Sequence, residues 1–292
     1  MPEFVSHCPL CGSDHSRLFD QRNFRGQSVS NRLCQNCGLV YQSPRMTSQE
    51  TEAFYAAEYR RMYQGNEDPT SKDLAVQRAR SAVLLRFVRP HLERISRHLD
   101  IGCSAGLLLQ EFQRGFNCLP AGVEPGKAYR TYARVQGLNV HASLEELKTK
   151  EKSLFDLISM SHVLEHLPNP VAYLADLREA PLSPGGWLLL EVPNLYAHDS
   201  FETAHLFSFS ARTLAMTVQQ AGYDIIRLEA HGRPRSDLVP YYLTLLARAR
   251  SEPERNNPLH PEKMTGFKRR FGLLRRRVLS RLFPKKAWIE IS

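Results

Sequence analysis

The chain has 292 residues, enough for roughly two domains, and its 42% hydrophobic content is typical of a globular protein. No apolar run reaches the roughly 18 residues that a membrane-spanning helix needs, so we expect none. The net charge of +9 is confined to one segment, because residues 263–286 hold ten of the 39 basic residues and none of the 30 acidic ones. The nearly neutral remainder argues against a body built to track nucleic-acid phosphates.

Two Cys-x-x-Cys pairs lie near the start of the chain, formed by Cys8 with Cys11 and by Cys34 with Cys37. Pairs about twenty residues apart are typical of a tetrahedral four-cysteine zinc site, which has no open position and is therefore structural. Disulfides and a redox pair are the alternatives. Because no signal peptide precedes Cys8, we expect reduced thiols and a cytoplasmic protein.

A glycine-rich turn is predicted directly after a buried strand at 97–101. Asp100 lies at the C-terminal end of that strand, and Gly102 and Gly106 permit tight turning and close backbone approach. An apolar helical pattern then begins, so the unit aims free backbone N–H groups at an anionic or polar ligand. Glu124 follows the next predicted strand, where a carboxylate can accept hydrogen bonds from both hydroxyls of a ribose.

Further buried strands are predicted at 155–160 and within 182–194, and helical patterns lie between the strands, as repeated βαβ units require. The predicted fold is therefore α/β, with a Rossmann-like, doubly wound sheet. A dinucleotide-binding domain is the alternative, but its fingerprint needs G-x-G-x-x-G and this chain has G-x-x-x-G.

The C-terminal segment 251–292 is predicted to be a linker followed by a basic amphipathic helix. Six apolar side chains fall on one face at helical spacing, and basic side chains occupy the flanks and the far face. The apolar residues are Met264, Phe267, Phe271, Leu274, Val278 and Leu282. Such a helix suits peripheral contact of residues 263–286 with the inner, anionic face of a membrane; a helix packed on the core and a solvated tail are the alternatives.

Four sequence blocks resemble class I S-adenosylmethionine-dependent methyltransferases. They are LDIGCSAG at 99–106, GVEP at 122–125, SHVLEHLPNP at 161–170 and LSPGGWLLLEVPN at 182–194, and a fifth, HLFSFS at 205–210, follows them. The resemblance implies a seven-stranded sheet whose last two strands come from 223–229 and 238–247, one of them antiparallel. The domains expected are a zinc ribbon (1–45), an aromatic-rich linker or lid (46–79), the methyltransferase core (80–250) and the linker with its basic tail (251–292).

The resemblance also implies a site for S-adenosylmethionine. The glycine turn would hold the methionyl part, Glu124 would bind the ribose, and Asp100 would orient the turn and the amino group. Ser104 stands where many members have glycine, and Ser143 where an adenine-binding acid is often found. The implied cofactor-binding residues are Asp100, Gly102, Cys103, Ser104, Gly106, Glu124, Pro125, Ser143, Leu144, Ser161 and His162.

Catalysis of methyl transfer sets few chemical demands on the protein. Displacement at a sulfonium is in-line, so the protein must supply alignment and, for a hydroxyl or a carbon acid, a base. Histidine has a pKa near neutrality and suits this role. We predict His205 as the base and His166 as the next candidate, with Glu165 beside it. A transfer that uses no base is the alternative.

The acceptor is predicted from the order of the modules. Cysteine pairs, an aromatic-rich stretch and then the methyltransferase blocks resemble the branch that acts on sugars and surface polysaccharides. In its sugar C-methyltransferases an acid precedes the equivalent of His205, where this chain has Ala204. The resemblance implies a sugar in a nucleotide-linked or lipid-linked glycan, methylated on oxygen or carbon. The alternatives are an rRNA or tRNA base methyltransferase, a quinone or small-molecule O-methyltransferase, and a catalytically inert binding module.

Overall fold

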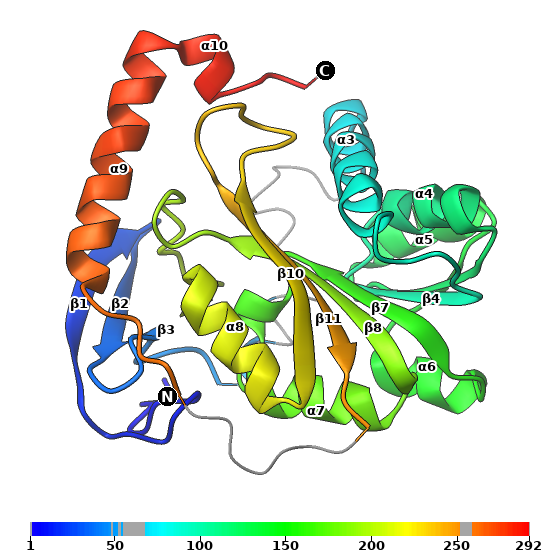
Figure 1. Ribbon diagram of the computed structural model, residues 1–292, viewed down its shortest axis with the longest axis horizontal. Coiled ribbons are helices and arrows are strands. Elements are labelled where there is room, and N and C mark those ends of the chain that lie inside the picture. Colours follow the sequence, from blue (N-terminus) through cyan, green and yellow to red (C-terminus); the bar gives the residue numbers. More distant parts are fainter. Residues whose placement is uncertain (1, 48, 52–53, 55–67, 252–258, 292) are drawn as a thin grey trace.

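A large mixed sheet with helices on both faces forms the centre of the molecule, and a smaller sheet and a long C-terminal helix lie along one side (Figure 1). The computed structural model describes residues 2–47, 49–51, 54, 68–251 and 259–291. Residues 48, 52–53 and 55–67 of the predicted lid at 46–79 lie outside the described residues, and its last part begins helix α3 (Ser71–Val88).

The large sheet has seven strands in the order β10-β11-β8-β7-β4-β5-β6. Its strands are β4 (Arg97–Ile101), β5 (Leu119–Val123), β6 (Asn139–His141), β7 (Phe155–Ser161), β8 (Leu182–Pro193), β10 (Tyr223–His231) and β11 (Tyr242–Ala249). Strands β4 to β8 pair in parallel, and β11 is antiparallel to both of its neighbours. The predicted seven-stranded sheet, with one antiparallel strand among the last two, is confirmed.

Helices cover both faces of this sheet because successive strand side chains point to opposite sides. Leu157 and Leu189 pack under α3 and α4, whereas Ile158 and Leu190 pack under α7 and α8. The helices that follow α3 are α4 (Leu107–Phe116), α5 (Lys127–Val135), α6 (Leu144–Lys150), α7 (Pro170–Glu179) and α8 (Ala211–Gln220), with a short 3₁₀ helix η1 (Leu164–His166) after β7.

The strand order reverses at β4, and this reversal positions the site. From β4 the chain proceeds outward through β5 and β6, then returns to pair β7 on the other side of β4. Ligands of doubly wound sheets bind beyond the carboxyl ends of the strands at such a switch point. The glycine turn after β4 and the segment after β7 therefore face the same crevice.

The cysteine-bearing segment is tied into the core rather than standing apart from it. Its strands β1 (Ser16–Phe24), β2 (Gln27–Cys34) and β3 (Val40–Gln42) form an antiparallel sheet with β9 (Phe207–Ser208). Strand β9 belongs to the stretch between β8 and α8, so the sheet combines two regions that lie far apart in the sequence. The small sheet therefore extends across the boundary predicted at residue 45, because it includes β9 from a later part of the chain.

The C-terminal segment forms helix α9 (Thr265–Leu282) and the short α10 (Pro284–Ala287). The residues just before α9 are bound to the cysteine-bearing segment, because the backbone N–H of Glu262 donates to the carbonyl of Cys37 at 2.9 Å. The predicted helix is therefore present and packed. Among the described residues, no helix combines the length and apolarity that crossing a bilayer requires.

Candidate active site and cysteine cluster

A cavity of about 980 Å³ opens at the carboxyl ends of β4, β5 and β7. The predicted residues that line it are Asp100, Gly102, Cys103, Ser104, Glu124, Pro125, Ser143, Ser161, His162, His166 and His205. Three further predicted residues are not part of the cavity lining. Gly106 precedes α4 as its N-cap, Leu144 begins α6 and packs against the core, and Glu165 is buried in η1.

The glycine turn is anchored to the neighbouring strand. The backbone N–H groups of Gly102 and Cys103 both donate to the carbonyl of Val123, at 2.8 and 3.0 Å. Gly102 has a φ of +73°, and a Cβ on it would lie 2.5 Å from the side chain of Val163. Ser104 also adopts the left-handed region, with a φ of +52°. This conformation favours glycine, which is the residue that the resemblance leads one to expect there.

Glu124 is held by the backbone so that its carboxylate faces the cavity. Its Oε2 accepts the N–H of Ser104 at 2.9 Å, and its Oε1 accepts the N–H of Gly126 at 2.8 Å. The residue is only 4% exposed, yet it lines the cavity. Each carboxylate oxygen has a second lone pair, so Glu124 can also accept hydrogen bonds from two hydroxyls of a ligand.

Asp100 is a buried carboxyl at the end of a polar chain. Its Oδ1 accepts the hydroxyl of Ser159 at 2.6 Å, and the Ser159 oxygen lies 2.8 Å from Nε2 of His98. Burial raises the pKa of Asp100 to about 7, against the Ser159 hydrogen bond and with help from the charge of Glu124. A cation bound beside Asp100 would favour the ionised form. Ser159 and His98 were not predicted from the sequence, where they stand out only as polar residues within apolar strands.

Ser143 is committed to the local backbone. Its hydroxyl caps α6 by accepting the N–H of Glu146 at 3.2 Å, and the Glu146 carboxylate accepts the N–H of Ala142 at 2.7 Å. This reciprocal cap explains a serine at this position without any ligand. Ala142 and Ser143 still line the cavity, so the adenine end of a nucleoside would meet small side chains there.

Histidines and carboxylates gather on the other side of the cavity. Ligand atoms of Glu165, His166 and His205 lie within 4.8 Å of one another, and the two imidazole rings are 4.7 Å apart between centroids. Nδ1 of His166 lies 2.8 Å from the carbonyl of Ala204, and Nδ1 of His205 lies 2.9 Å from that of Ser200. Carbonyls only accept, so both Nδ1 atoms carry their protons.

The two histidines differ in protonation. Burial lowers the pKa of His166 to about 4, although Glu165 opposes the shift. Burial also disfavours a charged His205, but the hydrogen bond and charge of Glu202, 3.0 Å from its Nε2, outweigh this effect and raise the pKa. At neutral pH His166 is therefore a neutral imidazole, whereas the pKa of His205 is shifted in the opposite direction, upward.

Glu165 stays ionised despite its burial. Burial alone would raise its pKa, but the nearby imidazoles of His162, His166 and His205 bring it down to about 2. His162 lies between Glu165 and Glu191, 3.5 and 3.4 Å away, and has a φ of +56°. Buried Glu191 is also contacted by Arg80 at 3.1 Å. Neither Glu191 nor Arg80 was predicted from the sequence, where the acid within the apolar run of β8 is the one local signal.

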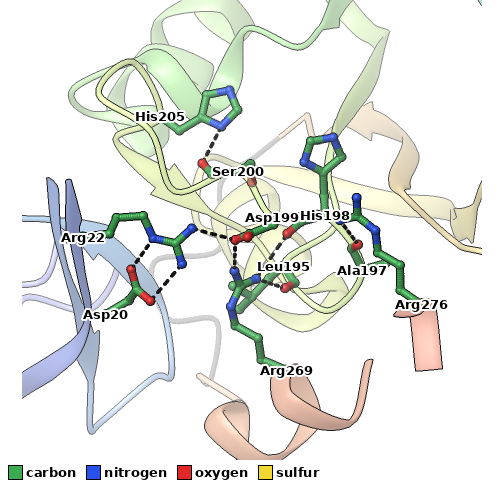
Figure 2. Close-up of polar contacts among 10 residues, drawn as sticks. All are labelled: Asp20, Arg22, Leu195, Ala197, His198, Asp199, Ser200, His205, Arg269 and Arg276. Atoms are coloured by element: carbon green, nitrogen blue, oxygen red, sulfur yellow. Dashed lines mark hydrogen bonds and ion pairs between the residues drawn. The ribbon is translucent and has the colours of Figure 1, made fainter. Parts of the chain in front are cut away.

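One loop, residues 194–206, carries His198, Glu202 and His205 into the cavity; we call it the acceptor loop. Arginines from both ends of the chain hold it (Figure 2). Arg269 of α9 donates to the carbonyl of His198 at 3.2 Å and to the carboxylate of Asp199 at 2.8 Å. Arg22 of β1 donates to the same carboxylate at 3.0 Å. The loop is therefore clamped between the small sheet and the C-terminal helix.

The four N-terminal cysteines form one cluster. The sulfur atoms of Cys8 and Cys37 are 3.6 Å apart, those of Cys11 and Cys34 are 3.5 Å apart, and all four lie within 4.8 Å of one another. No disulfide joins them. Four thiolates about 2.3 Å from one tetrahedral ion would be about 3.8 Å apart, so the cluster has the size to hold a metal.

The sheet, the glycine turn and the two buried acids define a class I S-adenosylmethionine-dependent methyltransferase. Comparison with known families agrees. The model of a methyltransferase domain family matches residues 73–228, more than half of the chain, and the chain belongs to that family.

Individual relatives are more distant. The chain is 30% identical over 118 residues to a ubiquinone biosynthesis O-methyltransferase of Nitrosococcus oceani, covering 38% of this chain and 49% of that protein. It is 27% identical over 119 residues to the protein of that name from Coxiella burnetii, covering 38% and 50%. The chain thus spans about half the length of these curated relatives.

A solved structure confirms the fold. The Burkholderia thailandensis 1,6-didemethyltoxoflavin-N1-methyltransferase superposes with a TM-score of 0.57 at 17% identity, over 79% of this chain and 99% of that one. At this identity the likeness concerns the fold alone and does not identify the methyl acceptor.

Proposed function

We propose that this enzyme transfers the methyl group of S-adenosylmethionine to a hydroxyl group of a polar, sugar-like acceptor. The observation that carries the proposal is the polar wall of the cavity, formed by His162, His166, His198, Glu202 and His205. Imidazole and carboxylate groups can hydrogen-bond several hydroxyls at once. A sugar offers such hydroxyls on every side of its ring.

The residues of this chain fit the cofactor. Two buried carboxylates, Asp100 and Glu124, face one cavity, and such groups need cationic or hydrogen-bonding partners. Glu124 would accept the ribose hydroxyls, and ionised Asp100 would face the amino group. Gly102 keeps the turn free of a side chain. When bound, S-adenosylmethionine supplies an activated methyl group on a sulfonium.

We assign the base to His166 rather than to His205, which reverses the order expected from sequence. A base must be neutral before it accepts a proton, and the pKa of about 4 keeps His166 neutral. Its Nε2 would take the proton that the acceptor hydroxyl loses, while Nδ1–H stays bonded to Ala204. The carboxylate of Glu165, 3.9 Å from Nε2, would stabilise the imidazolium formed. Glu202, held by His205, would orient the acceptor.

We also propose that Cys8, Cys11, Cys34 and Cys37 hold one structural zinc ion. Two observations support this proposal. The sulfur–sulfur distances are close to those expected around one tetrahedral ion, and all four ligands are cysteine thiolates. The backbone N–H of Gly12 donates to the carbonyl of Cys8 at 2.8 Å, and that of Gly38 to Cys34 at 3.0 Å, closing each pair into a tight turn.

Methylation of a quinone-like or other aromatic hydroxyl is the second candidate. The similarity to ubiquinone biosynthesis O-methyltransferases favours it. Apolar side chains such as Leu84, Leu108 and Tyr173 also line part of the cavity, although they would suit a ring of either kind.

An acceptor screen with deuterated S-adenosylmethionine separates the candidates. Purified enzyme would be offered nucleotide sugars and glycan fragments in one panel and hydroxylated benzoquinone precursors in the other, with mass spectrometry detecting the added methyl group. We expect label only in the first panel. Label confined to the second panel would reject the sugar proposal, and a product methylated on nitrogen would reject both.

A further inference from the structure

Helix α9 turns its apolar face away from the protein. Residues advance by about 100° each along a helix, so two sets of its side chains lie on opposite sides. The set against the protein comprises Thr265, Arg269, Gly272, Arg276 and Leu279. The opposite set comprises Phe267, Phe271, Leu274, Val278 and Leu282, which are 45% to 65% exposed. A helix that only packs on a globular core is oriented the other way round.

Polar contacts fix this orientation. The guanidinium of Arg269 is buried, stacks 4.0 Å above the ring of Phe201 and bonds the acceptor loop (Figure 2). Arg276 donates to the carbonyl of Ala197 at 3.2 Å. Gly272 lies so close to the carbonyl of Tyr196 that a Cβ would overlap it. These contacts fix the rotation of α9 about its axis, so its apolar side chains point into solvent.

Basic side chains border the outward apolar stripe on both sides. Lys268 and Arg275 flank one side, Arg270, Arg277 and Arg281 flank the other, and Lys285 and Lys286 extend the row into α10. All seven residues are exposed, and α9 contains no acid. A stripe of aromatic and aliphatic side chains between two cationic rows matches the headgroup and acyl boundary of an anionic bilayer.

We propose that this face of α9, the docking face, binds the surface of an anionic lipid bilayer with the helix axis parallel to the membrane. A second copy of the chain is the weaker occupant, because pairing two such faces would bring like charges together. RNA would use the cations but would leave the stripe of Phe267, Phe271 and Leu274 exposed to water. The bound bilayer would lie one helix diameter from the acceptor loop. The proposal does not depend on which acceptor the cavity takes.

Vesicle flotation tests the docking face on the full chain. The probes are vesicles of phosphatidylcholine alone and of phosphatidylcholine mixed with phosphatidylglycerol. Wild type should float only with the anionic vesicles, and less so as salt is raised. Phe267→Ser/Phe271→Ser/Leu274→Ser should lower partitioning at least tenfold. Leu119→Ser/Val135→Ser, which removes two apolar side chains that are 64% and 77% exposed elsewhere, should change nothing.

A charge variant tests the electrostatic half of the proposal. Arg270→Gln/Arg277→Gln/Arg281→Gln should weaken binding to anionic vesicles by about 10²-fold. Cofactor affinity measured on each variant shows that the fold is intact. Absence of wild-type flotation, or flotation that ignores the triple serine variant, would overturn the proposal. So would a wild-type dimer that the serine variant converts to a monomer, or RNA binding through the same arginines without vesicle binding.

Discussion

In the acceptor loop, Nε2 of His205 lies 3.0 Å from Oε1 of Glu202. The residue directly before His205 is Ala204, and Glu202 brings a carboxylate to the imidazole from three residues upstream. Because Nδ1 of His205 is bonded to Ser200, both ring nitrogens are occupied. The imidazole is therefore held on both sides, and the carboxylate of Glu202 also faces the cavity.

The pH–rate profile should identify the base. If His166 accepts the proton, kcat/KM for the acceptor, measured at saturating S-adenosylmethionine, should be nearly flat from pH 6 to 8 and should fall only at acidic pH, because the pKa of His166 is about 4. His166→Ala should lower kcat by roughly 10²–10⁴-fold. His205→Ala should mainly raise KM for the acceptor, since Glu202 loses its partner. If kcat/KM instead rises with pH above 6.5, and this rise disappears in His205→Ala, then His205 is the base. Unchanged turnover in both variants would mean that alignment of the substrates suffices.

Removal of the Glu124 carboxylate should weaken cofactor binding. Two hydrogen bonds to a charged group are worth about 1.5–3 kcal/mol each, so Glu124→Ala should raise Kd for S-adenosylmethionine by at least about 10²-fold. The variant also frees the N–H groups of Ser104 and Gly126. Glu145→Ala, which removes an exposed acid from α6, serves as the control. Equal calorimetric affinities of wild type and Glu124→Ala would refute the assigned role.

Asp100 should make both stability and cofactor affinity depend on pH near neutrality. Its folded-state pKa is raised from 3.8 to about 7, so its contribution to stability is complete below pH 3.8 and is lost as pH rises through about 7. The melting temperature of the ligand-free enzyme should therefore drop between pH 5 and 8 more than that of Asp100→Asn.

Cofactor affinity should follow the opposite trend. The cationic ligand favours ionised Asp100, so affinity should increase with pH up to about 7, and binding below that pH should release a proton. Calorimetry in buffers of different ionisation enthalpy measures this release. The absence of proton release at pH 6 would contradict the assignment.

The acceptor loop should lose its order when its arginine clamp is removed. Arg269 is 5% exposed and bonds three groups of the loop, so Arg269→Ala should destabilise the protein by about 2–4 kcal/mol and lower turnover more than cofactor affinity. Arg270→Ala, the exposed neighbour, should do neither. Chemical denaturation and acceptor kinetics give the two readouts. Equal behaviour of the two variants would show that the clamp is dispensable.

Local patterns were sufficient to predict the glycine turn and the acid that follows the next strand. The glycine turn and Glu124 depend on strands, turns and acids within short stretches, and the structure places them around one cavity. Ser159, Glu191 and Arg80 could not be predicted in the same way. Each is a polar residue whose role depends on a partner from another strand or helix, such as Asp100 for Ser159 and Glu191 for Arg80.

The C-terminal helix shows a second limit. Its two faces were predicted from spacing, but the pattern could not say which face meets the protein. An amphipathic helix is expected to bury its apolar face, whereas in α9 the side chain of Arg269 is buried and the apolar face is exposed. Its partners lie in the acceptor loop, about 70 residues earlier in the chain. Charges that pair over such distances leave no local signal.

Metal removal should affect the acceptor side more than the cofactor side. The backbone N–H of Gln42 donates to the carbonyl of Leu206 at 2.8 Å, and β3 pairs with β9 directly after His205. Loss of zinc would free Cys34 and Cys37, which bracket the turn before β3. Elemental analysis should give one zinc per chain, and Cys37→Ser or chelation should abolish it. Turnover should then fall at least tenfold while cofactor affinity changes little, because the glycine turn and Glu124 lie on the separate large sheet. A metal-free protein with a fully folded N-terminal segment and unchanged turnover would reject the structural zinc.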